Sequence, residues 1–412
     1  MIHRLEIENF YSICETQIID LRIGAKVPDE ELRFAQIEDS SGDRVPKTIA
    51  IYGHNASGKS NVLRALQFVA WFLSDSFKLE PTEDLPVSRF ADGNTNPIRV
   101  KVDFDWFASL NQNHKEAASE RALARYTYEV KFFALSGGPL SVLSEELRQL
   151  PIRGKSRRIF LRSENGDVQT STDYPVKGLT QALAKLRGNV SLTSSVAQIA
   201  EHPATKAILD WANNITTNIF NISTNPFERN PGIAEQDLFR FYKGHPFLVN
   251  DMNQLLGRVD IGIRSMSFAD TVLGPEPQFQ HSGLDRPLLF LFESKGTRQF
   301  FSIYPHIWEA LHYGGIAVID ELDSTIHPML LPEILRWFHD PVENPHNAQL
   351  WFSGHSASLL EELQKEEIFF AEKDQLGRTS IYGLKNIESV RRSDNFYQKY
   401  LGGVYGAVPR IG

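Results

Sequence analysis

Apolar residues that alternate with polar ones mark the antiparallel strands that this chain is expected to form. In such a strand successive side chains point to opposite faces, so one face can pack on a core while the other meets water. The pairs Gly137-Gly138 and Asn165-Gly166 fall next to segments of this type and predict hairpin turns. Strands are expected at Ile2–Glu8, Thr16–Leu21, Ile98–Phe104, Arg125–Phe132 and Ile159–Arg162.

Two other runs, Thr48–Tyr52 and Gly315–Ile319, are apolar almost throughout and predict strands that are buried on both faces. A further strand is expected from Ala348 towards His355. Apolar residues at helical spacing follow the first run and predict a helix from Asn61 to about Phe77.

The pattern changes again in the middle of the chain. Apolar residues at helical spacing, interrupted by prolines, predict a subdomain of several short helices over residues 176–265. The spaced residues are Leu179, Leu183, Leu186, Ile208, Trp211, Ile215 and Ile219. The sequence therefore predicts an α/β protein. Its expected parts are an N-terminal lobe over 1–77, a β-rich subdomain over 78–175, this helical subdomain, and a C-terminal lobe over 266–412.

Composition narrows the class of protein. The 412 residues are 42% hydrophobic, which is enough for a large core, and the net charge of −8 argues against wholesale nucleic-acid binding but leaves a local basic face open. Cys14 is the only cysteine, so no intrachain disulfide can form, as in proteins of a reducing cytosol. The N-terminus lacks the apolar core of a signal peptide, and no run reaches the roughly 20 apolar residues of a membrane span. A cytoplasmic protein with no membrane partner is expected.

The segment from Gly53 to Ser60 matches the phosphate-binding P-loop pattern G-x-x-x-x-G-K-[ST] between an expected strand and an expected helix. Glycines let the backbone wrap closely around a polyphosphate, and the helix start adds unpaired N–H donors. Lys59 is expected to reach the β- and γ-phosphates of ATP, and Ser60 to bind Mg²⁺. The predicted nucleotide-binding residues are Gly53, His54, Asn55, Ala56, Ser57, Gly58, Lys59, Ser60 and Asn61.

The buried run before Asp320 and Glu321 predicts the second half of the site, a Walker B strand. Asp320 would hold Mg²⁺, mostly through water, and Glu321 would act as the general base that polarises the attacking water. His355, at the end of a later strand, is a candidate sensor of the γ-phosphate. A core strand that ends in a solvated acidic turn, with a structural histidine, is the alternative.

A second helix is expected over the apolar stretch from Phe300 to about Tyr313, with a possible start at Ser294. Pro305 falls within its first turns, so the pattern does not fix the residue at which this helix begins. Serine and glycine at a helix start can bind an anion, so Ser294 and Gly296 are candidates for contacting a neighbour's nucleotide. An ordinary serine helix cap is the alternative. Leu135–Gly138 looks like a transporter signature, but it falls in a hairpin and is rejected.

Together these segments resemble the ABC-type ATPase heads of the SMC and RecF kind, and more closely the bacterial ATPases related to the OLD and RloA proteins. The resemblance spans nearly the whole chain. Its residues are Asn55 within the P-loop, Ile2–Glu8 with Asn9–Ser12, Ser294–Thr297, Asp320–Asp323 with His327-Pro328, Ser353–His355, and the tail Tyr400–Pro409.

The resemblance implies an ABC-ATPase head that binds ATP and Mg²⁺ between two copies of the chain, as a homodimer or a higher homo-oligomer. Ser294 and Gly296 of one head would meet the γ-phosphate bound at Lys59 of the other. Asp323 would be the D-loop residue and His355 the switch histidine.

Many relatives of this kind act in bacterial anti-phage defence beside a separate effector. The sequence after His355 is too short for the TOPRIM nuclease domain of OLD proteins, so we expect an ATPase that serves as sensor or scaffold for another chain, a nuclease or a toxin. The alternative is a RecF-like DNA-binding ATPase in DNA repair, which needs a basic face. Its candidates are Arg153, Lys155, Arg157, Arg158 and Arg162, for which a solvated hairpin is the favoured interpretation. A non-hydrolysing scaffold is disfavoured by Glu321, and a transporter ATPase by Asn55.

Overall fold

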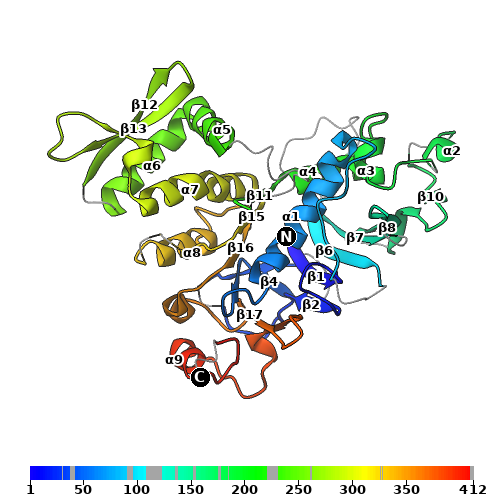
Figure 1. The fold of residues 1–412 in the computed structure, drawn as a ribbon. Coiled ribbons are helices and arrows are strands. Elements are labelled where there is room, and N and C mark those ends of the chain that lie inside the picture. The colour runs from blue at the N-terminus through cyan, green and yellow to red at the C-terminus, as the bar shows by residue number, and fades with distance from the viewer. Residues whose placement is uncertain are drawn as a thin grey trace.

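Two sheets with a helix between them form the centre of the molecule, and a smaller sheet stands to one side (Figure 1). The computed structural model describes residues 1–29, 31–37, 42–90, 96–107, 123–134, 138–151, 155–174, 178–183, 185–219, 231–259, 262–324, 326 and 328–408. Among these residues no helix combines the length and the apolar character that a membrane span requires.

The central sheet has six strands, of which the first five run parallel. Its strands in spatial order are β11 (Ile215–Thr217), β15 (Ile316–Ile319), β16 (Gln349–Ser353), β5 (Thr48–Tyr52), β17 (Ile368–Lys373) and the antiparallel β18 (Thr379–Gly383). β5, β15 and β16 are buried along their whole length, which explains their nearly continuous apolar sequences. Because parallel strands end at the same edge, the segments that follow these three strands meet there.

Successive residues of the central strands pack into two different cores. Ile49 and Ile51 of β5 join one core, whereas Ala50 and Tyr52 join the other, so each face of the sheet is covered. Helix α1 (Lys59–Asp75) lies in the first core, and helices α7 (Lys295–Tyr313) and α8 (Leu331–His339) contribute to the second. The predicted α/β class, with a P-loop core sheet flanked by helices, is confirmed.

The second sheet is antiparallel and has seven strands. In spatial order these are β10 (Val168–Thr170), β9 (Arg157–Arg162), β8 (Ser141–Pro151), β7 (Leu123–Phe133), β6 (Ile98–Phe107), β1 (Ile2–Glu8) and β2 (Gln17–Asp20). The β-rich part expected over 78–175 is therefore not a separate unit, because β1 pairs directly with β6. Gln349 of β16 ties the two sheets together, since its buried side chain bonds the backbone of Ile2 at 2.6 Å and 3.2 Å.

Residues 176–265 do not form one helical unit, which corrects the sequence prediction. Helices α2 (Thr180–Leu183), α3 (Leu192–Val196) and α4 (Pro203–Asn213) belong to the side of α1 and the seven-stranded sheet. Ile215 does not continue α4: the chain leaves the helix at Asn214, whose carbonyl accepts the Ile316 N–H at 2.8 Å, and pairs as β11 with β15.

The remainder of that segment belongs to the third sheet. Helices α5 (Pro231–Gly244) and α6 (Pro246–Val259) pack on β12 (Ile263–Thr271) and β13 (Gly274–His281), which pair with each other and with β14 (Leu288–Leu289). This unit lies at the upper left of Figure 1, across the central sheet from β7 and β8. A small hairpin of β3 (Phe34–Gln36) and β4 (Arg44–Pro46) precedes β5, and α9 (Phe396–Leu401) packs near the C-terminus.

Candidate functional site

The P-loop leaves the carboxyl end of β5 and enters α1 through a backbone that only glycine fits at Gly58. Gly58 has φ +104°, and a Cβ there would lie 2.2 Å from Thr379 Oγ1. Both the left-handed conformation and the lack of space therefore exclude a side chain. With Gly58 at the N-cap, α1 begins at Lys59 with no side-chain cap, so its first N–H groups stay available to a ligand.

Lys59 points its ammonium group back into the loop. Its Nζ donates to the carbonyl oxygens of Gly53 at 2.8 Å and of His54 at 3.2 Å. Burial lowers the pKa of Lys59, while Asp320, Glu321 and Asp323 oppose that shift. The contact of Lys59 with the outer phosphates, which the sequence predicts, stays a prediction.

Asp320 follows β15 and is fixed on several sides. Its carboxylate accepts the Ser60 hydroxyl at 3.0 Å and also the hydroxyl of Ser353, which itself accepts the Glu321 N–H at 2.8 Å. The side chain of Asn218 bonds both the N–H and the carbonyl of Asp320, at 2.8 Å and 3.0 Å. Asn218 was not predicted to matter, since its position carries no motif, and Ser353 was named only within the Ser353–His355 segment of the family resemblance, without a role of its own.

The paired oxygens of Ser60 and Asp320 fit Mg²⁺. Magnesium in nucleotide sites is held by one or two protein oxygens together with phosphates and water, rather than by a dedicated protein cage. In the described part of the chain no group of three or more His, Cys, Asp or Glu that could hold a metal is found. The fit to Mg²⁺ rests on the Ser60 and Asp320 oxygens alone. The donor set therefore suits the metal predicted from the sequence.

Glu321 and His355 face each other beside the P-loop. The backbone of Glu321 has φ +53°, which is uncommon for a residue with a side chain, and its Oε1 lies 3.5 Å from His355 Nε2. Asp323 accepts the backbone N–H groups of His355, at 2.8 Å, and of Ser356. Within this chain Asp323 is thus a positioning residue for His355.

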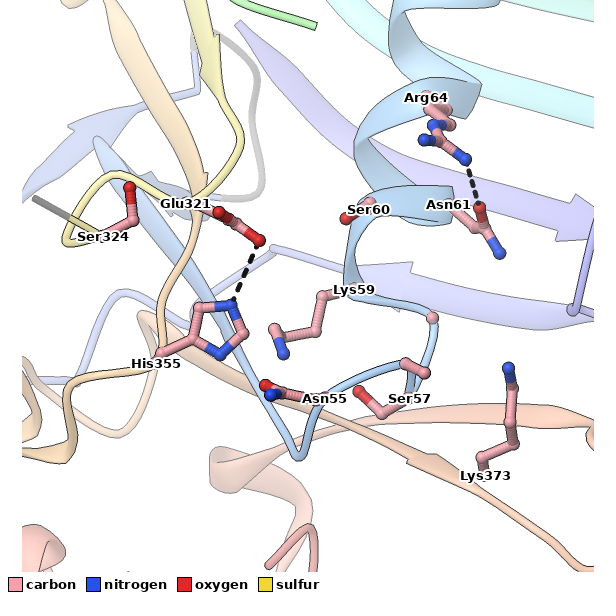
Figure 2. A pocket seen from close by; sticks show the side chains of 12 residues that line it. Asn55, Ser57, Lys59, Ser60, Asn61, Arg64, Glu321, Ser324, His355 and Lys373 are labelled. Atoms are coloured by element: carbon pink, nitrogen blue, oxygen red, sulfur yellow. Dashed lines mark hydrogen bonds and ion pairs between the residues drawn. The ribbon is translucent and has the colours of Figure 1, made fainter. Parts of the chain in front are cut away.

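These groups line a cleft of 610 Å³ (Figure 2). The cleft contains seven of the predicted nucleotide-binding residues together with Glu321 and His355, while Gly53 and His54 lie behind it as acceptors for Lys59. Three further residues, Arg64, Ser324 and Lys373, line the cleft without having been predicted. The full lining is Asn55, Ala56, Ser57, Gly58, Lys59, Ser60, Asn61, Arg64, Glu321, Ser324, His355 and Lys373.

Side chains from both ends of the chain brace the P-loop from outside. The Thr379 hydroxyl donates to the Ser57 carbonyl at 2.8 Å and shares a 2.8 Å hydrogen bond with Ser12 Oγ. Ser12 Oγ also accepts the Asn61 amide at 2.7 Å. Hydroxyl groups that lie far from the loop in sequence therefore hold its shape. No local sequence pattern predicts these contacts.

Ser294 and Gly296 lie at the start of α7 and do not line this cleft. Ser294 caps the helix, because its Oγ accepts the Thr297 N–H at 3.1 Å and bonds Thr297 Oγ1 at 2.8 Å. The two residues before Glu293, Leu291 and Phe292, expose 69% and 68% of their surface. Within one chain, the two predicted anion sites thus remain separate.

Three of the five basic residues proposed for DNA binding are engaged within the chain. Arg158 pairs with Glu146 at 2.7 Å and Arg157 with Asp173 at 2.9 Å. Arg162 is buried and donates to backbone carbonyls, including that of Val190 at 3.0 Å. Arg153, His327 and the Leu135–Gly137 part of the rejected signature lie outside the described residues. These contacts disfavour the DNA-repair alternative, which needed a basic face.

A comparison with protein-family models matches residues 49–120 and 203–361 to the family described as "AAA domain, putative AbiEii toxin, Type IV TA system". These segments contain the P-loop, Ser294, Asp320, Glu321 and His355. The match confirms a P-loop ATPase of the AAA kind, whereas the OLD- and RloA-related branch stays a prediction. No curated protein matches the chain.

Solved structures with a loosely similar fold include the SMC head domain from Thermotoga maritima, at 13% identity and a TM-score of 0.39, covering 93% of this chain and 98% of that one. Another is an SMC head bound to the C-terminal winged-helix domain of ScpA, at 12% identity and a TM-score of 0.42, covering 94% of this chain and 99% of that one.

Proposed function

Since this chain belongs to the AAA-domain family described for a putative AbiEii toxin of a type IV toxin–antitoxin system, we propose that it binds and hydrolyses ATP. The observation that carries the proposal is the position of Glu321. Its carboxylate faces His355 in the same cleft as the P-loop, on the side of Lys59 and Ser60 (Figure 2). A carboxylate in this place can take a proton from an attacking water, which nucleotide binding alone does not require.

Each residue of the cleft has a part in this hydrolysis. Lys59 and the N–H groups at the start of α1 bind the phosphates and offset their charge. Glu321 takes a proton from water as the water oxygen attacks the γ-phosphorus, and the bond to the bridging oxygen of ADP breaks. His355 orients Glu321 and senses the γ-phosphate. Mg²⁺, when held by Ser60 and Asp320, supplies further neutralisation of the phosphate oxygens.

The active unit is a homodimer in which each ATP lies between two chains. This part of the proposal is supported by the separation of Ser294 and Gly296 from the P-loop of their own chain, and by the exposed apolar residues Leu291 and Phe292 beside the capped start of α7. ATP would close the two heads, and hydrolysis would open them. Such a cycle is a two-state switch that another protein can read.

We further propose that the switch controls a separate effector, a nuclease or a toxin, in a cytoplasmic bacterial defence against phage. This proposal rests on the resemblance to OLD- and RloA-related ATPases. The family description names a toxin, which is compatible with a role in bacterial defence. A purified chain that cut DNA or RNA through its own residues would contradict the separation of ATPase and effector.

The first experiment measures the solution mass of the Glu321→Gln variant with and without Mg-ATP. Removal of the base should leave bound ATP intact, so we expect the mass to rise from monomer to dimer or higher only when Mg-ATP is present. A monomer under both conditions would refute the shared site. A constant oligomer would refute ATP-driven assembly and place the switch inside a preformed complex.

A further inference from the structure

Lys373 is a cation at the wall of the nucleotide cleft. It is the last residue of β17, the strand that pairs in parallel with β5 and so ends beside the P-loop. Opposite it in the β17–β18 hairpin stands Thr379, whose hydroxyl holds the Ser57 carbonyl at 2.8 Å. The same hairpin thus supports the shape of the loop and presents a lysine to the cleft.

No hydrogen bond or ion pair of the Lys373 side chain is found among the residues that the structure describes. Its neighbour Glu372 points to the other face of the strand, where its carboxylate accepts the Ala407 N–H. Lys373 is therefore not engaged by the nearest acidic side chain of its own strand. By contrast, the ammonium group of Lys59 is already bonded by the carbonyls of Gly53 and His54.

The cleft has two ends, which the positions of its side chains distinguish. Figure 2 shows Glu321 and His355 on one side of the P-loop and Lys373 on the other, where Asn61 and Arg64 also lie. The general base must stand next to the phosphate that water attacks. The γ-phosphate therefore belongs at the end with Glu321, and the part of the nucleotide that remains as ADP belongs at the end with Lys373.

We propose that Lys373 is a phosphate-binding residue of this site, which contacts a phosphate shared by ATP and ADP rather than the γ-phosphate. This rests on the proposed nucleotide site and extends it to a segment outside the matched residues, since the family match ends at residue 361. A lysine at this position of the hairpin offers a phosphate a charge-assisted hydrogen bond, and its charge adds to that of Lys59.

Binding constants for ADP and for a non-hydrolysable ATP analogue, both with Mg²⁺, test the proposal on the full chain. Lys373→Met should raise the dissociation constants of both nucleotides by about tenfold, the usual worth of one charge-assisted contact. Lys373→Arg should recover most of the affinity because it restores the charge. The loss in Lys373→Met should also shrink as salt increases, because screening weakens the contact in the wild type.

Lys78→Met provides the matched control. Lys78 stands just beyond the far end of α1, pairs with Asp75 and is 79% exposed, so its removal deletes the same charge away from the cleft. Its nucleotide affinity should equal that of the wild type, and thermal unfolding of all variants checks that each is folded.

Three outcomes would overturn the assignment. Equal affinities of Lys373→Met and the wild type would show that Lys373 touches no phosphate. A loss confined to the ATP analogue would move Lys373 to the γ-phosphate, and a loss that Lys78→Met shares would make the effect one of overall charge. If the wild type itself bound neither nucleotide, the proposed function would fall as well, whereas binding without hydrolysis would remove only the catalytic part.

Discussion

The starts of α1 and α7 are both helix N-termini of the kind that binds anions, yet their surroundings differ sharply. The start of α1 is held by Thr379 from β18, by Ser12 from the segment after β1 and, through Ser60, by Asp320 after β15. Among the residues described, the hydroxyl of Ser294 at the start of α7 is bonded only by Thr297 of the same helix turn. One helix start is built into the fold and the other stands at its surface.

The difference indicates how the two starts would be used. A loop fixed by contacts from several segments is preorganised, so it can bind phosphate without first being ordered. A capped helix start beside exposed apolar residues such as Leu291 and Phe292 has the features of a contact surface instead. We therefore expect the P-loop to bind nucleotide within one chain, and Ser294 to act on the nucleotide of a second copy.

The largest expected effect separates catalysis from binding at the P-loop. Glu321→Gln keeps the size of the side chain but removes the base, so ATP turnover should fall by about 10²–10⁴ while ATP affinity is retained. Turnover and equilibrium binding of the same preparation give both numbers. Turnover at the wild-type level would show that another group accepts the proton.

The next effect tests the start of α7. Ser294→Arg places a large side chain where close packing of two heads is expected, so ATP-dependent dimerisation should weaken by about 10–10², as overpacking by 1–3 kcal/mol implies. Nucleotide affinity of the monomer should stay within twofold. The solution mass in the presence of ATP, measured by light scattering in the Glu321→Gln background, reports the dimerisation. Unaltered assembly would mean that α7 does not reach the shared site.

Gly58→Ala tests whether the P-loop is as tightly built as its contacts indicate. The new Cβ would meet Thr379 Oγ1 at 2.2 Å and would occupy a backbone with φ +104°. We expect a loss of about 1–3 kcal/mol in the free energy of unfolding, measured by denaturant titration, together with weaker ATP binding. The half-buried Gly377 has φ +77° with no atom within 4 Å of a built Cβ, so Gly377→Ala is a control that carries the backbone strain alone.

The smallest effect concerns the bracing of the loop. Thr379→Val keeps the shape of the side chain but removes the hydroxyl that holds the Ser57 carbonyl, so ATP affinity should fall by about fivefold, corresponding to one hydrogen bond of roughly 1 kcal/mol. Thr379→Ser retains the hydroxyl and should bind ATP nearly as the wild type does. Identical affinities for the Val and Ser variants would show that the brace does not affect the bound loop.

Segments whose local pattern agreed with their packing were predicted well. The strands at Thr48–Tyr52 and Ile316–Ile319 are buried on both faces, as their apolar sequences predicted. The segment of β8 was left without an assignment, and its pairing with β7 and β9 on both sides makes it a strand. Ile215 was assigned to a helix because of its helical spacing to Ile208 and Trp211, and pairing with β15 overrode that spacing.

The sequence by itself determined the two halves of the site. The P-loop at Gly53–Ser60 and the carboxylates at Asp320 and Glu321 are local patterns at the ends of buried strands, and parallel strands bring their carboxyl ends to one edge. Only the tertiary structure decided that Ser12, Asn218, Thr379 and Lys373 join them. A lone serine, asparagine, threonine or lysine has no local signal of its own, because its role depends on which distant segment the fold lays beside it.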